Sequence, residues 1–284
     1  MAFALNLADD GTIVRPVLTA PDASAHKYNR GHAVVWSGPP LRTGAARLSA
    51  QAALAVGAGL VTIIGERAAL EEQAAHVTAI MLREADAELS AIDNRVTALA
   101  IGPGAGADIA DKVCQFLDRG LATVLDADAI TAFEADSSRL FKRLNADDVI
   151  TPHAGEFARL FPDISLHDRS STALLAARRS GAVVLLKGSN THVAAPDGRT
   201  AINRHAAPWL ATAGSGDVLT GLICGLLAQG VPAFEAACIA AWLHGDIGVR
   251  AGPGLTADNM IGHIPLVLQG CLADAKADGA RSGA

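Results

Sequence analysis

Short runs of β-branched and aliphatic residues alternate along the chain with longer, alanine-rich runs. The short runs have the length and composition of buried strands, and the longer runs are typical of packed helices. We therefore expect strands over Ala33–Trp36, Leu60–Ile64, Ala98–Ile101, Ala122–Leu125, Asp148–Ile150 and Val183–Leu186. We expect helices over Gly44–Val56, Asp108–Arg119, Glu156–Phe161, Ser170–Ser180, Val218–Gln229, Phe234–Arg250 and Thr256–Val267. Because strands and helices alternate, the pattern predicts an α/β fold, a mostly parallel sheet with helices on both faces.

The pattern changes to strict alternation around Pro196-Asp197-Gly198, between Thr191–Ala194 and Thr200–Ile202. This arrangement predicts a β-hairpin that turns on Asp-Gly. We find no internal repeat, no low-complexity linker and no change of composition that would mark a domain boundary. A single domain over residues 1–284 is therefore expected, with a core over about 26–270 and loosely held ends before residue 26 and after Ala273.

Composition narrows the class of protein. The chain has 284 residues, of which 50% are hydrophobic, enough for one sizeable α/β core. Its formal net charge of −6 argues against nucleic acid as a general partner, since binding to phosphate backbones requires a basic face. The apolar stretch from Val218 to Val249 is interrupted by Gly230, Pro232 and charged residues, so we expect two buried helices and no membrane anchor.

The four cysteines show no spacing typical of a metal site. Cys114, Cys224 and Cys238 lie in apolar helical patterns, and the fourth is Cys271. Small, buried, reduced thiols are therefore expected, which suits a cytoplasmic protein.

The segment Ala211-Thr212-Ala213-Gly214-Ser215-Gly216-Asp217, followed at once by an apolar run, carries the most chemistry. Its glycines let backbone N–H groups approach a phosphate, and the helix that follows presents its positive end to the same anion. The N–H groups of Gly214, Ser215 and Gly216 can form an anion hole. Asp217 can accept a proton from an attacking hydroxyl. Taken alone, the segment is equally consistent with a simple helix N-cap.

Four more clusters fall where predicted strands end. They are Ile101-Gly102-Pro103-Gly104-Ala105-Gly106, Asp126-Ala127-Asp128, Thr151-Pro152-His153-Ala154-Gly155-Glu156 and Lys187-Gly188-Ser189-Asn190-Thr191. Each has an ordinary structural interpretation as a turn, an N-cap, a helix start or a strand exit. Ligands of open parallel sheets bind at the carboxyl ends of strands, so four such clusters at one edge together indicate a binding site.

Together with Gly44-Ala45-Ala46-Arg47-Leu48 and Gly57-Ala58-Gly59-Leu60-Val61-Thr62, these motifs form an ordered set. The set resembles the ADP/ATP-dependent NAD(P)H-hydrate dehydratases, which have the ribokinase-like three-layer α/β/α fold. The resemblance extends from about His26 to about Val267. The sequence departs from the family at Ala206-Ala207-Pro208-Trp209, where Gly-Asn-Pro is usual, and this affects the contact that the loop makes.

The resemblance implies a lyase that repairs hydrated NADH and NADPH of the S configuration, which carry a hydroxyl at C6 of the nicotinamide ring. ADP or ATP phosphorylates that hydroxyl, and phosphate then departs with help from the ring nitrogen. Asp217 is implied as the catalytic base. Glu156 is implied to organise Mg²⁺, directly or through water, and Asp126 is a weaker candidate for the same role.

The resemblance also assigns the remaining site residues. Ala45, Gly104, His153 and Asp217 are implied to contact the hydrated dinucleotide. The residues implied to bind the adenine nucleotide are Lys187, Gly188, Ser189, Asn190, Thr191 and Gly216. For His153 the alternative is a helix cap that bonds only backbone, and His244 is expected to pack in the core.

Two other functions stay open. One is a kinase of the same fold that phosphorylates a hydroxymethylpyrimidine or a thiazole alcohol, against which His153 and Gly44-Ala45-Ala46 argue. The other is a non-catalytic adenine-nucleotide-binding protein, which has no need of Asp217. The resemblance favours ADP over ATP and implies a homotetramer. It also implies pairing with a NAD(P)H-hydrate epimerase, whose domain we do not find in this sequence.

Overall fold

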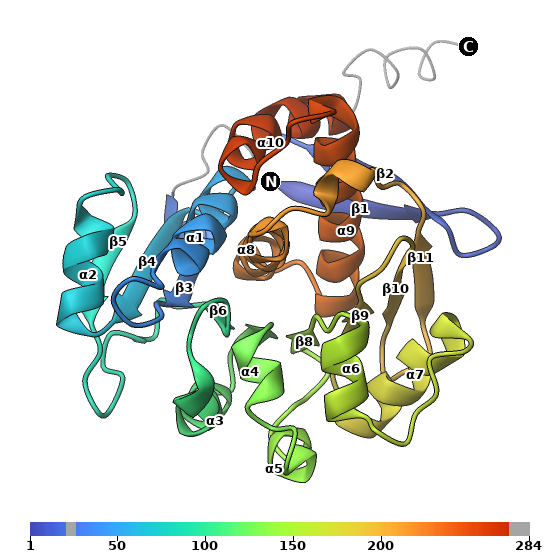
Figure 1. Cartoon of the computed structure of the whole chain (residues 1–284). Coiled ribbons are helices and arrows are strands. Elements are labelled where there is room, and N and C mark those ends of the chain that lie inside the picture. The colour runs from blue at the N-terminus through green and yellow to red at the C-terminus, as the bar shows by residue number, and fades with distance from the viewer. Residues whose placement is uncertain (21–26, 273–284) are drawn as a thin grey trace.

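The computed structural model describes residues 1–20 and 27–272. Its main strands are β3 (His32–Trp36), β4 (Leu60–Gly65), β5 (Met81–Glu84), β6 (Ala98–Ile101), β7 (Ala122–Leu125), β8 (Val149–Ile150), β9 (Val183–Leu186), β10 (Thr191–Ala194) and β11 (Thr200–Asn203). They form a nine-stranded sheet in the order β11-β10-β9-β8-β7-β6-β3-β4-β5 (Figure 1). Neighbours from β9 to β5 pair in parallel, whereas β10 pairs antiparallel with both β9 and β11. The predicted sheet and hairpin are therefore confirmed.

Helices cover both faces of this sheet (Figure 1). One face carries α1 (Gly44–Ala55), α8 (Ser215–Ala228), α9 (Ala233–Ala251) and α10 (Ala257–Cys271). The other carries α3 (Ala110–Leu117), α4 (Asp128–Thr131), α5 (Ser137–Phe141), α6 (Ala154–Leu160) and α7 (Arg169–Ser180). Each face has its own hydrophobic core. Along β3, Ala33 and Val35 pack into the core under α1, α8, α9 and α10, and Val34 and Trp36 pack into the core on the opposite face. The predicted three-layer α/β/α architecture is confirmed.

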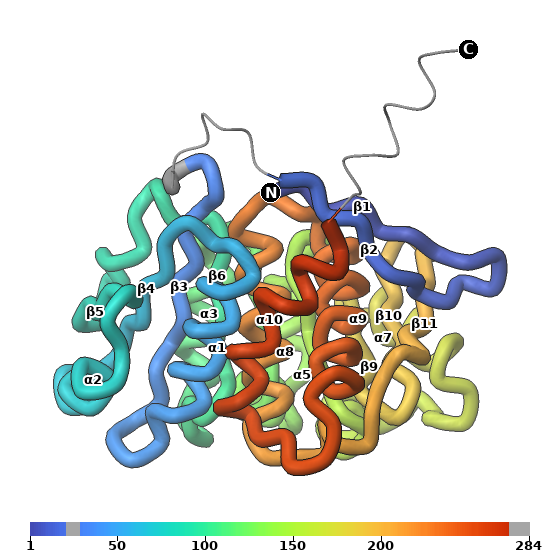
Figure 2. Tube along the Cα trace, turned by 90° about the horizontal axis from the view of Figure 1, so that it is seen from above, coloured from blue at the N-terminus to red at the C-terminus, as the bar shows by residue number. Residues whose placement is uncertain are grey.

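The N-terminal residues pack on the core, contrary to expectation. β1 (Ala2–Leu7) and β2 (Ile13–Thr19) form an antiparallel hairpin that lies beside α9 and α10 (Figure 2). The Ile202 N–H donates to the Gly11 carbonyl at 2.9 Å, which ties the hairpin to β11. The prediction of a loosely held start is wrong over residues 1–20, because Ile13 and Leu18 are buried. Residues 21–26 and the tail after Ala273 lie outside the described residues.

Several short elements differ from the prediction. The helix expected over Asp108–Arg119 is a 3₁₀ helix, η2 (Ala107–Ile109), followed by α3, and α8 begins at Ser215 instead of Val218. The sequence pattern did not predict β5, α2 (Arg67–Ala74), α4, α5, or the 3₁₀ helices η1 (Lys27–Arg30) and η3 (Pro208–Leu210). Elements of three to eight residues give little periodicity, so the pattern does not distinguish them from loops.

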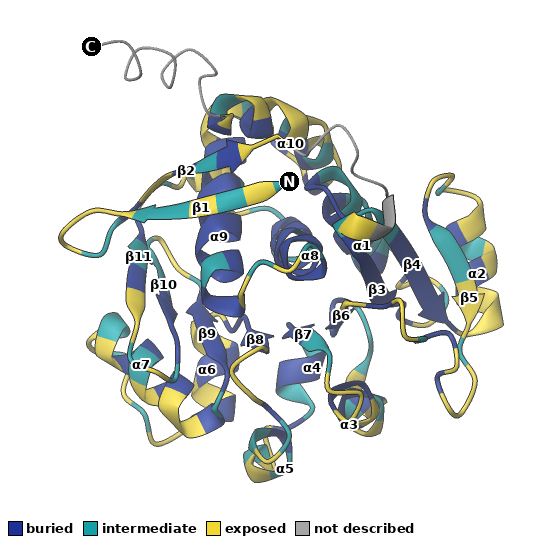
Figure 3. Cartoon of the chain, turned by 180° about the vertical axis from the view of Figure 1, so that it is seen from behind, coloured by how far each residue is buried: buried dark blue, intermediate teal, exposed yellow. Residues whose placement is uncertain are grey.

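Helix α8 is buried along nearly its whole length (Figure 3). A Cβ atom on Gly221 would lie 2.1 Å from the carbonyl oxygen of Ser49, and one on Gly225 would lie 2.4 Å from Cγ1 of Val56. Only glycine permits α1 and α8 to approach so closely. The Ser49 hydroxyl also donates to the carbonyl oxygen of Asp217 at 2.8 Å, so α1 holds the first turn of α8 in place.

None of the helices within residues 1–20 and 27–272 is long and apolar enough to cross a membrane. The four cysteines are free and buried, as predicted. Burial raises the pKa of the Cys224 thiol to about 12, which leaves it protonated and unreactive at neutral pH.

Replacing Gly221 by Ala should destabilise the protein by about 1–3 kcal/mol, since the added methyl group meets backbone atoms of α1. Urea denaturation followed by circular dichroism measures this change. Gly262→Ala is the matched control, because Gly262 also lies in a helix but has open space at its Cβ position. That variant should gain up to about 1 kcal/mol from helix propensity. Equal stability of the two variants would show that the α1–α8 contact tolerates a side chain.

Candidate active site

A cavity of about 880 Å³ opens at the carboxyl ends of β7, β8 and β9, beside the start of α8. Nine predicted site residues line it: Asp126, His153, Lys187, Gly188, Ser189, Thr191, Ser215, Gly216 and Asp217. The other predicted residues lie outside its lining: Ala45, Gly104, Glu156, Asn190 and Gly214. The structure thus brings Ser215, Gly216 and Asp217, at the start of α8, together with the segment Lys187–Thr191. This segment is here called the nucleotide loop, after the role that the resemblance implies for it.

Lys187 is the central charge of this cavity. Its Nζ lies 2.6 Å from Oδ1 of Asp126 and 3.7 Å from Oε2 of Glu156. Burial by itself lowers the pKa of Lys187, but the carboxylates of Asp126 and Glu156 outweigh it and raise that pKa above its usual value. The Thr220 hydroxyl donates to the other oxygen of Asp126 at 2.9 Å. Lys187 therefore stays charged. It follows β9 and contacts Asp126, which follows β7, and Glu156 of α6, so its ion pairs connect these three elements.

The backbone between the two aspartates of the β7 exit is strained. Ala127 adopts φ 48° and ψ −117°, a conformation that costs a non-glycine residue about 1–3 kcal/mol. It allows Asp126 to turn toward Lys187 while Asp128 bonds elsewhere. Oδ2 of Asp128 accepts the Gly106 N–H at 2.7 Å and lies 3.5 Å from Nη2 of Arg42.

Asp217 lies in the first turn of α8. Burial, and next the negative charge of Asp126, raise the pKa of the Asp217 carboxyl to about 6. Lys187 opposes this shift, and Asp128 adds to it. A carboxylate with a pKa close to neutral is better matched to proton transfer than an ordinary aspartate.

The turn that leads into α8 is fixed by α9. Gly214 has φ +85° and is the N-cap, and Ser215 is the first helical residue. Nε2 of His244 lies 2.9 Å from the Ser215 hydroxyl and 3.0 Å from its carbonyl oxygen. Because a carbonyl only accepts, Nε2 carries a proton. Burial lowers the pKa of His244 to about 4, so the ring is neutral at pH 7 and packs as predicted, although it also lines the cavity.

His153 caps helix α6. Its Nδ1 accepts the N–H groups of Gly155 and Glu156 at 2.9 and 3.3 Å, and the Glu156 carboxylate accepts the N–H of His153 at 2.8 Å. This is a capping box with histidine in the place of serine. The side chain of His153 is 56% exposed, and it lines the cavity. The helix-cap alternative thus describes Nδ1 of His153, whereas Nε2 lies 3.4 Å from Oε1 of Glu156.

Ala45 and Gly104 lie close together at a second position, outside the lining of the cavity. A Cβ atom on Gly104 would lie 3.2 Å from Cβ of Ala45 and 2.9 Å from the carbonyl oxygen of Arg42. These residues follow β3 and β6, the neighbours at which the strand order reverses. Such a reversal is where open α/β sheets usually bind ligands.

The loop that departs from the family pattern also reaches the cavity. Ala206, Ala207 and Pro208 line it, and Pro208 begins η3. Asn203 lines the same wall, where its side-chain amide donates to the carbonyl oxygens of His205 and Ala241. The loop therefore presents methyl groups and a proline ring to the cavity.

Comparison with known proteins establishes the family. The sequence model described as NAD(P)H-hydrate dehydratase (Carb_kinase) matches residues 33–273. The chain belongs to the NAD(P)H-hydrate dehydratase family.

Similar curated proteins of this family are longer than this chain. The bifunctional NAD(P)H-hydrate repair enzyme Nnr of Synechocystis sp. is 39% identical over 249 residues, which are 84% of this chain and 46% of that protein. The enzyme of the same name from Moorella thermoacetica is 38% identical over 278 residues, or 90% of this chain and 52% of that protein. The chain spans about half the length of these relatives.

Similar solved structures confirm the ribokinase-like fold. An ADP/ATP-dependent NAD(P)H-hydrate dehydratase from Bacillus subtilis, co-crystallised with ATP and Mg²⁺, is 28% identical with a TM-score of 0.76, and the match covers 90% of this chain and 95% of that one. A ribokinase-like superfamily protein from Enterococcus faecalis is 24% identical with a TM-score of 0.79, covering 90% and 93% of the two chains.

Some residues of the site were not identified from the sequence. The Thr220 hydroxyl donates to the Asp126 carboxylate beside Lys187, and His244 holds the start of α8. Thr220 and His244 lie inside apolar helical runs, where a polar residue is usually assigned to packing. Only the fold shows that they lie at this sheet edge.

Replacing Lys187 by Met should lower the free energy of unfolding by about 3 kcal/mol or more, since Asp126 and Glu156 lose their shared cation. Urea titration at neutral pH measures this loss. Arg159→Met is the control, because it breaks the exposed 3.8 Å pair with Glu134. That control should change stability by less than about 0.5 kcal/mol. A loss in Lys187→Met no larger than in the control would contradict the central role of the lysine.

Proposed function

We propose that the chain converts the S epimers of hydrated NADH and NADPH back to NADH and NADPH, using ADP or ATP to phosphorylate the C6 hydroxyl before phosphate leaves. The observation that carries this proposal is Asp217, which lines the cavity beside the nucleotide loop and has its pKa raised to about 6. Membership of the dehydratase family supports it, as does the similarity to the Bacillus subtilis dehydratase.

In this reaction Asp217 accepts the proton of the C6 hydroxyl while the hydroxyl oxygen attacks the terminal phosphoryl group. The bond from that phosphorus to the bridging oxygen breaks, so ADP leaves as AMP and ATP as ADP. The lone pair of the ring nitrogen then expels phosphate from C6. Loss of a proton from C5 completes the C5–C6 double bond of the dihydronicotinamide.

The proposed anion hole is formed by Gly214, Ser215 and Gly216 at the start of the fourteen-residue helix α8. The first N–H groups of a helix have no intrahelical acceptor and attract anions. The Ser215 N–H is partly used, since it donates to the Thr212 carbonyl at 3.3 Å. We therefore assign the larger share of charge stabilisation to the Gly216 N–H.

In this proposal the nucleotide loop and the Ala45–Gly104 pair bind different substrates. Lys187, Gly188, Ser189, Asn190 and Thr191, with Gly216, bind the adenine nucleotide. Ala45 and Gly104, with His153 and Asp217, contact the hydrated dinucleotide, because small residues at the strand-order reversal let a ring or pyrophosphate approach.

Mg²⁺ is the proposed cofactor. Within residues 1–20 and 27–272, no group of three His, Cys, Asp or Glu side chains could hold a metal by itself. Mg²⁺ commonly combines one or two carboxylates with substrate phosphates and water, and this is the kind of site that Glu156 and Asp126 can supply. Glu156 would hold the ion directly or through water, and the ion would neutralise charge on the phosphoryl oxygens.

We further propose ADP as the preferred donor, a homotetramer, a cytoplasmic location and cooperation with a NAD(P)H-hydrate epimerase. The family resemblance supports these points, and relatives named as bifunctional repair enzymes support the last. Light scattering after size-exclusion chromatography tests the assembly.

The defining experiment follows absorbance at 340 nm with hydrated NADH, Mg²⁺ and either ADP, ATP or no nucleotide. Recovery of NADH that requires a nucleotide supports the proposal, and the faster donor identifies the preference. Release of a stable phosphate ester from hydroxymethylpyrimidine or thiazole alcohols, without recovery of NADH, would favour the kinase. Binding of nucleotide without either reaction would favour the non-catalytic alternative.

Asp217→Asn should lower kcat at least ~100-fold, because it removes the base but keeps the shape of the side chain. Isothermal titration should show nearly unchanged ADP affinity. In the wild type, kcat/KM should fall as pH drops through about 6, where the Asp217 carboxyl becomes protonated and can no longer accept a proton. Near-normal turnover in the variant would remove Asp217 from the chemistry.

His153→Ala should raise KM for hydrated NADH or lower kcat/KM, and leave ADP affinity unchanged. It should also cost about 1 kcal/mol of stability through the lost helix cap. His153→Asn separates the two roles, since Asn caps helices well but lacks the distal ring nitrogen. We expect this variant to keep wild-type stability and share the loss in kcat/KM. Unchanged kcat/KM in both variants would leave His153 with the cap alone.

A further inference from the structure

The first two residues of α7 contact both ends of the nucleotide loop. Nη2 of Arg169 donates to the carbonyl oxygen of Lys187, the first residue of the loop, at 2.6 Å. The Ser170 hydroxyl lies 2.9 Å from Nδ1 of His192, the residue that follows the loop. Adjacent residues of one helix thus fix the start and the end of a five-residue segment.

The guanidinium group of Arg169 also packs directly against the loop backbone. A Cβ atom on Gly188 would lie 2.7 Å from Nη2 and 3.0 Å from Cζ of Arg169. Nε of Arg169 is buried and has no hydrogen-bond partner among the described residues. An unpaired buried donor normally destabilises a protein. In this conformation Arg169 bonds the loop through Nη2 and leaves its own Nε without a hydrogen-bond partner.

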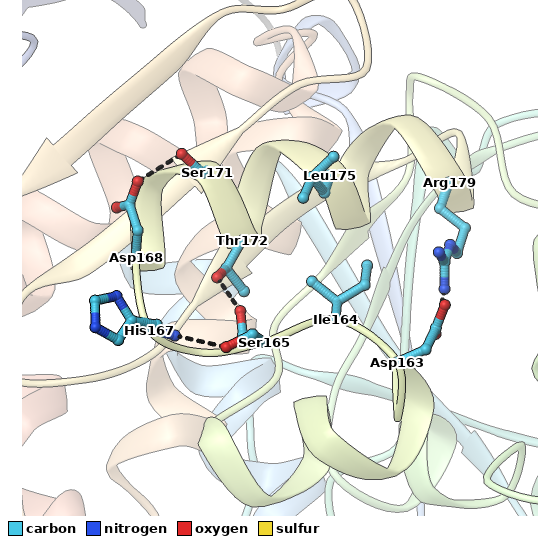
Figure 4. A pocket seen from close by; sticks show the side chains of 9 residues that line it. All are labelled: Asp163, Ile164, Ser165, His167, Asp168, Ser171, Thr172, Leu175 and Arg179. Atoms are coloured by element: carbon cyan, nitrogen blue, oxygen red, sulfur yellow. Dashed lines mark hydrogen bonds and ion pairs between the residues drawn. The ribbon is translucent and has the colours of Figure 1, made fainter.

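The base of this contact is itself well fixed (Figure 4). The Asp168 carboxylate caps α7 by accepting the Ser170 N–H, and it also accepts the Ser171 hydroxyl. The Thr172 hydroxyl donates to the carbonyl oxygen of Ser165, which lies in the segment before α7. These bonds tie the start of α7 to the preceding segment, so Arg169 and Ser170 extend from a rigid base.

We propose that Arg169 and Ser170 are positioning residues that hold the nucleotide loop in the conformation that binds adenine nucleotide. A loop that is already ordered loses less entropy when the ligand binds, which strengthens binding. The Arg169 cation also lies against the backbone of Lys187 and Gly188, where its field would favour an anion bound at the loop. The proposal rests on the proposed function in one respect, that the loop binds adenine nucleotide.

Isothermal titration of the full chain with ADP and Mg²⁺ tests this clamp. Arg169→Ala should raise Kd for ADP about tenfold, the usual effect of losing a hydrogen bond from a charged donor. Ser170→Ala should give a smaller increase. Arg178→Ala is the matched control, because Arg178 is an exposed arginine in the last turn of the same helix. It should bind ADP like the wild type.

Hydrogen exchange separates positioning from general stability. In Arg169→Ala, amides of residues 188–192 should exchange faster than in the wild type, while those of α8 and β6 stay unchanged. Arg169→Lys should recover part of the affinity, since it keeps the charge and one donor. KM for hydrated NADH should not change in any of these variants.

The outcomes distinguish the clamp from the proposed function. A wild-type chain that does not bind ADP or ATP would overturn the assignment of the nucleotide site. Wild-type binding together with unchanged Kd in Arg169→Ala and Ser170→Ala would overturn the clamp alone. If Arg169→Ala does not fold, Ser170→Ala decides: unchanged affinity and unchanged exchange at residues 188–192 would then overturn the clamp.

Discussion

The close approach of α1 and α8 is the constraint on which the candidate site depends. Gly221 and Gly225 remove the side chains that would hold the two helices apart, and the Ser49 hydroxyl bonds the first turn of α8. Because α8 is buried almost throughout, its N-terminus cannot shift without disturbing the core. Asp217 and the N–H groups beside it are thus set in position before any ligand binds, which is what electrostatic stabilisation of a transition state requires.

In the same site, different surroundings give two aspartate side chains different roles. Asp126 accepts hydrogen bonds from the Lys187 ammonium and the Thr220 hydroxyl. Burial and the charge of Asp126 instead raise the pKa of Asp217 to about 6. One aspartate serves as an anchor for a cation and the other is suited to exchange protons. Pairs of carboxyl groups with opposed environments are a common basis for acid–base chemistry.

Much of this arrangement could be predicted from the sequence, because it follows from periodicity and from motifs at strand ends. The central strands and the long helices of both layers carry apolar patterns, and glycines mark the segment that leads into α8, whereas the short helices α4 and α5 carry too little pattern to be predicted. The N-terminal hairpin was not predicted, since Pro16 and the exposed Val14 and Arg15 interrupt the alternation typical of a strand in β2. The ion pairs of Lys187 were not predicted either, because they join residues far apart in the chain that only the folded sheet brings together.

His153 both caps a helix and lines the cavity. Nδ1 accepts the backbone N–H groups at the start of α6, Nε2 lies 3.4 Å from Oε1 of Glu156, and the side chain is more than half exposed at the cavity. Any residue that accepts the same backbone N–H groups, Asn, Asp or Ser among them, preserves the helix while it changes the surface offered to a substrate. Position 153 can therefore mutate during evolution with little penalty in stability.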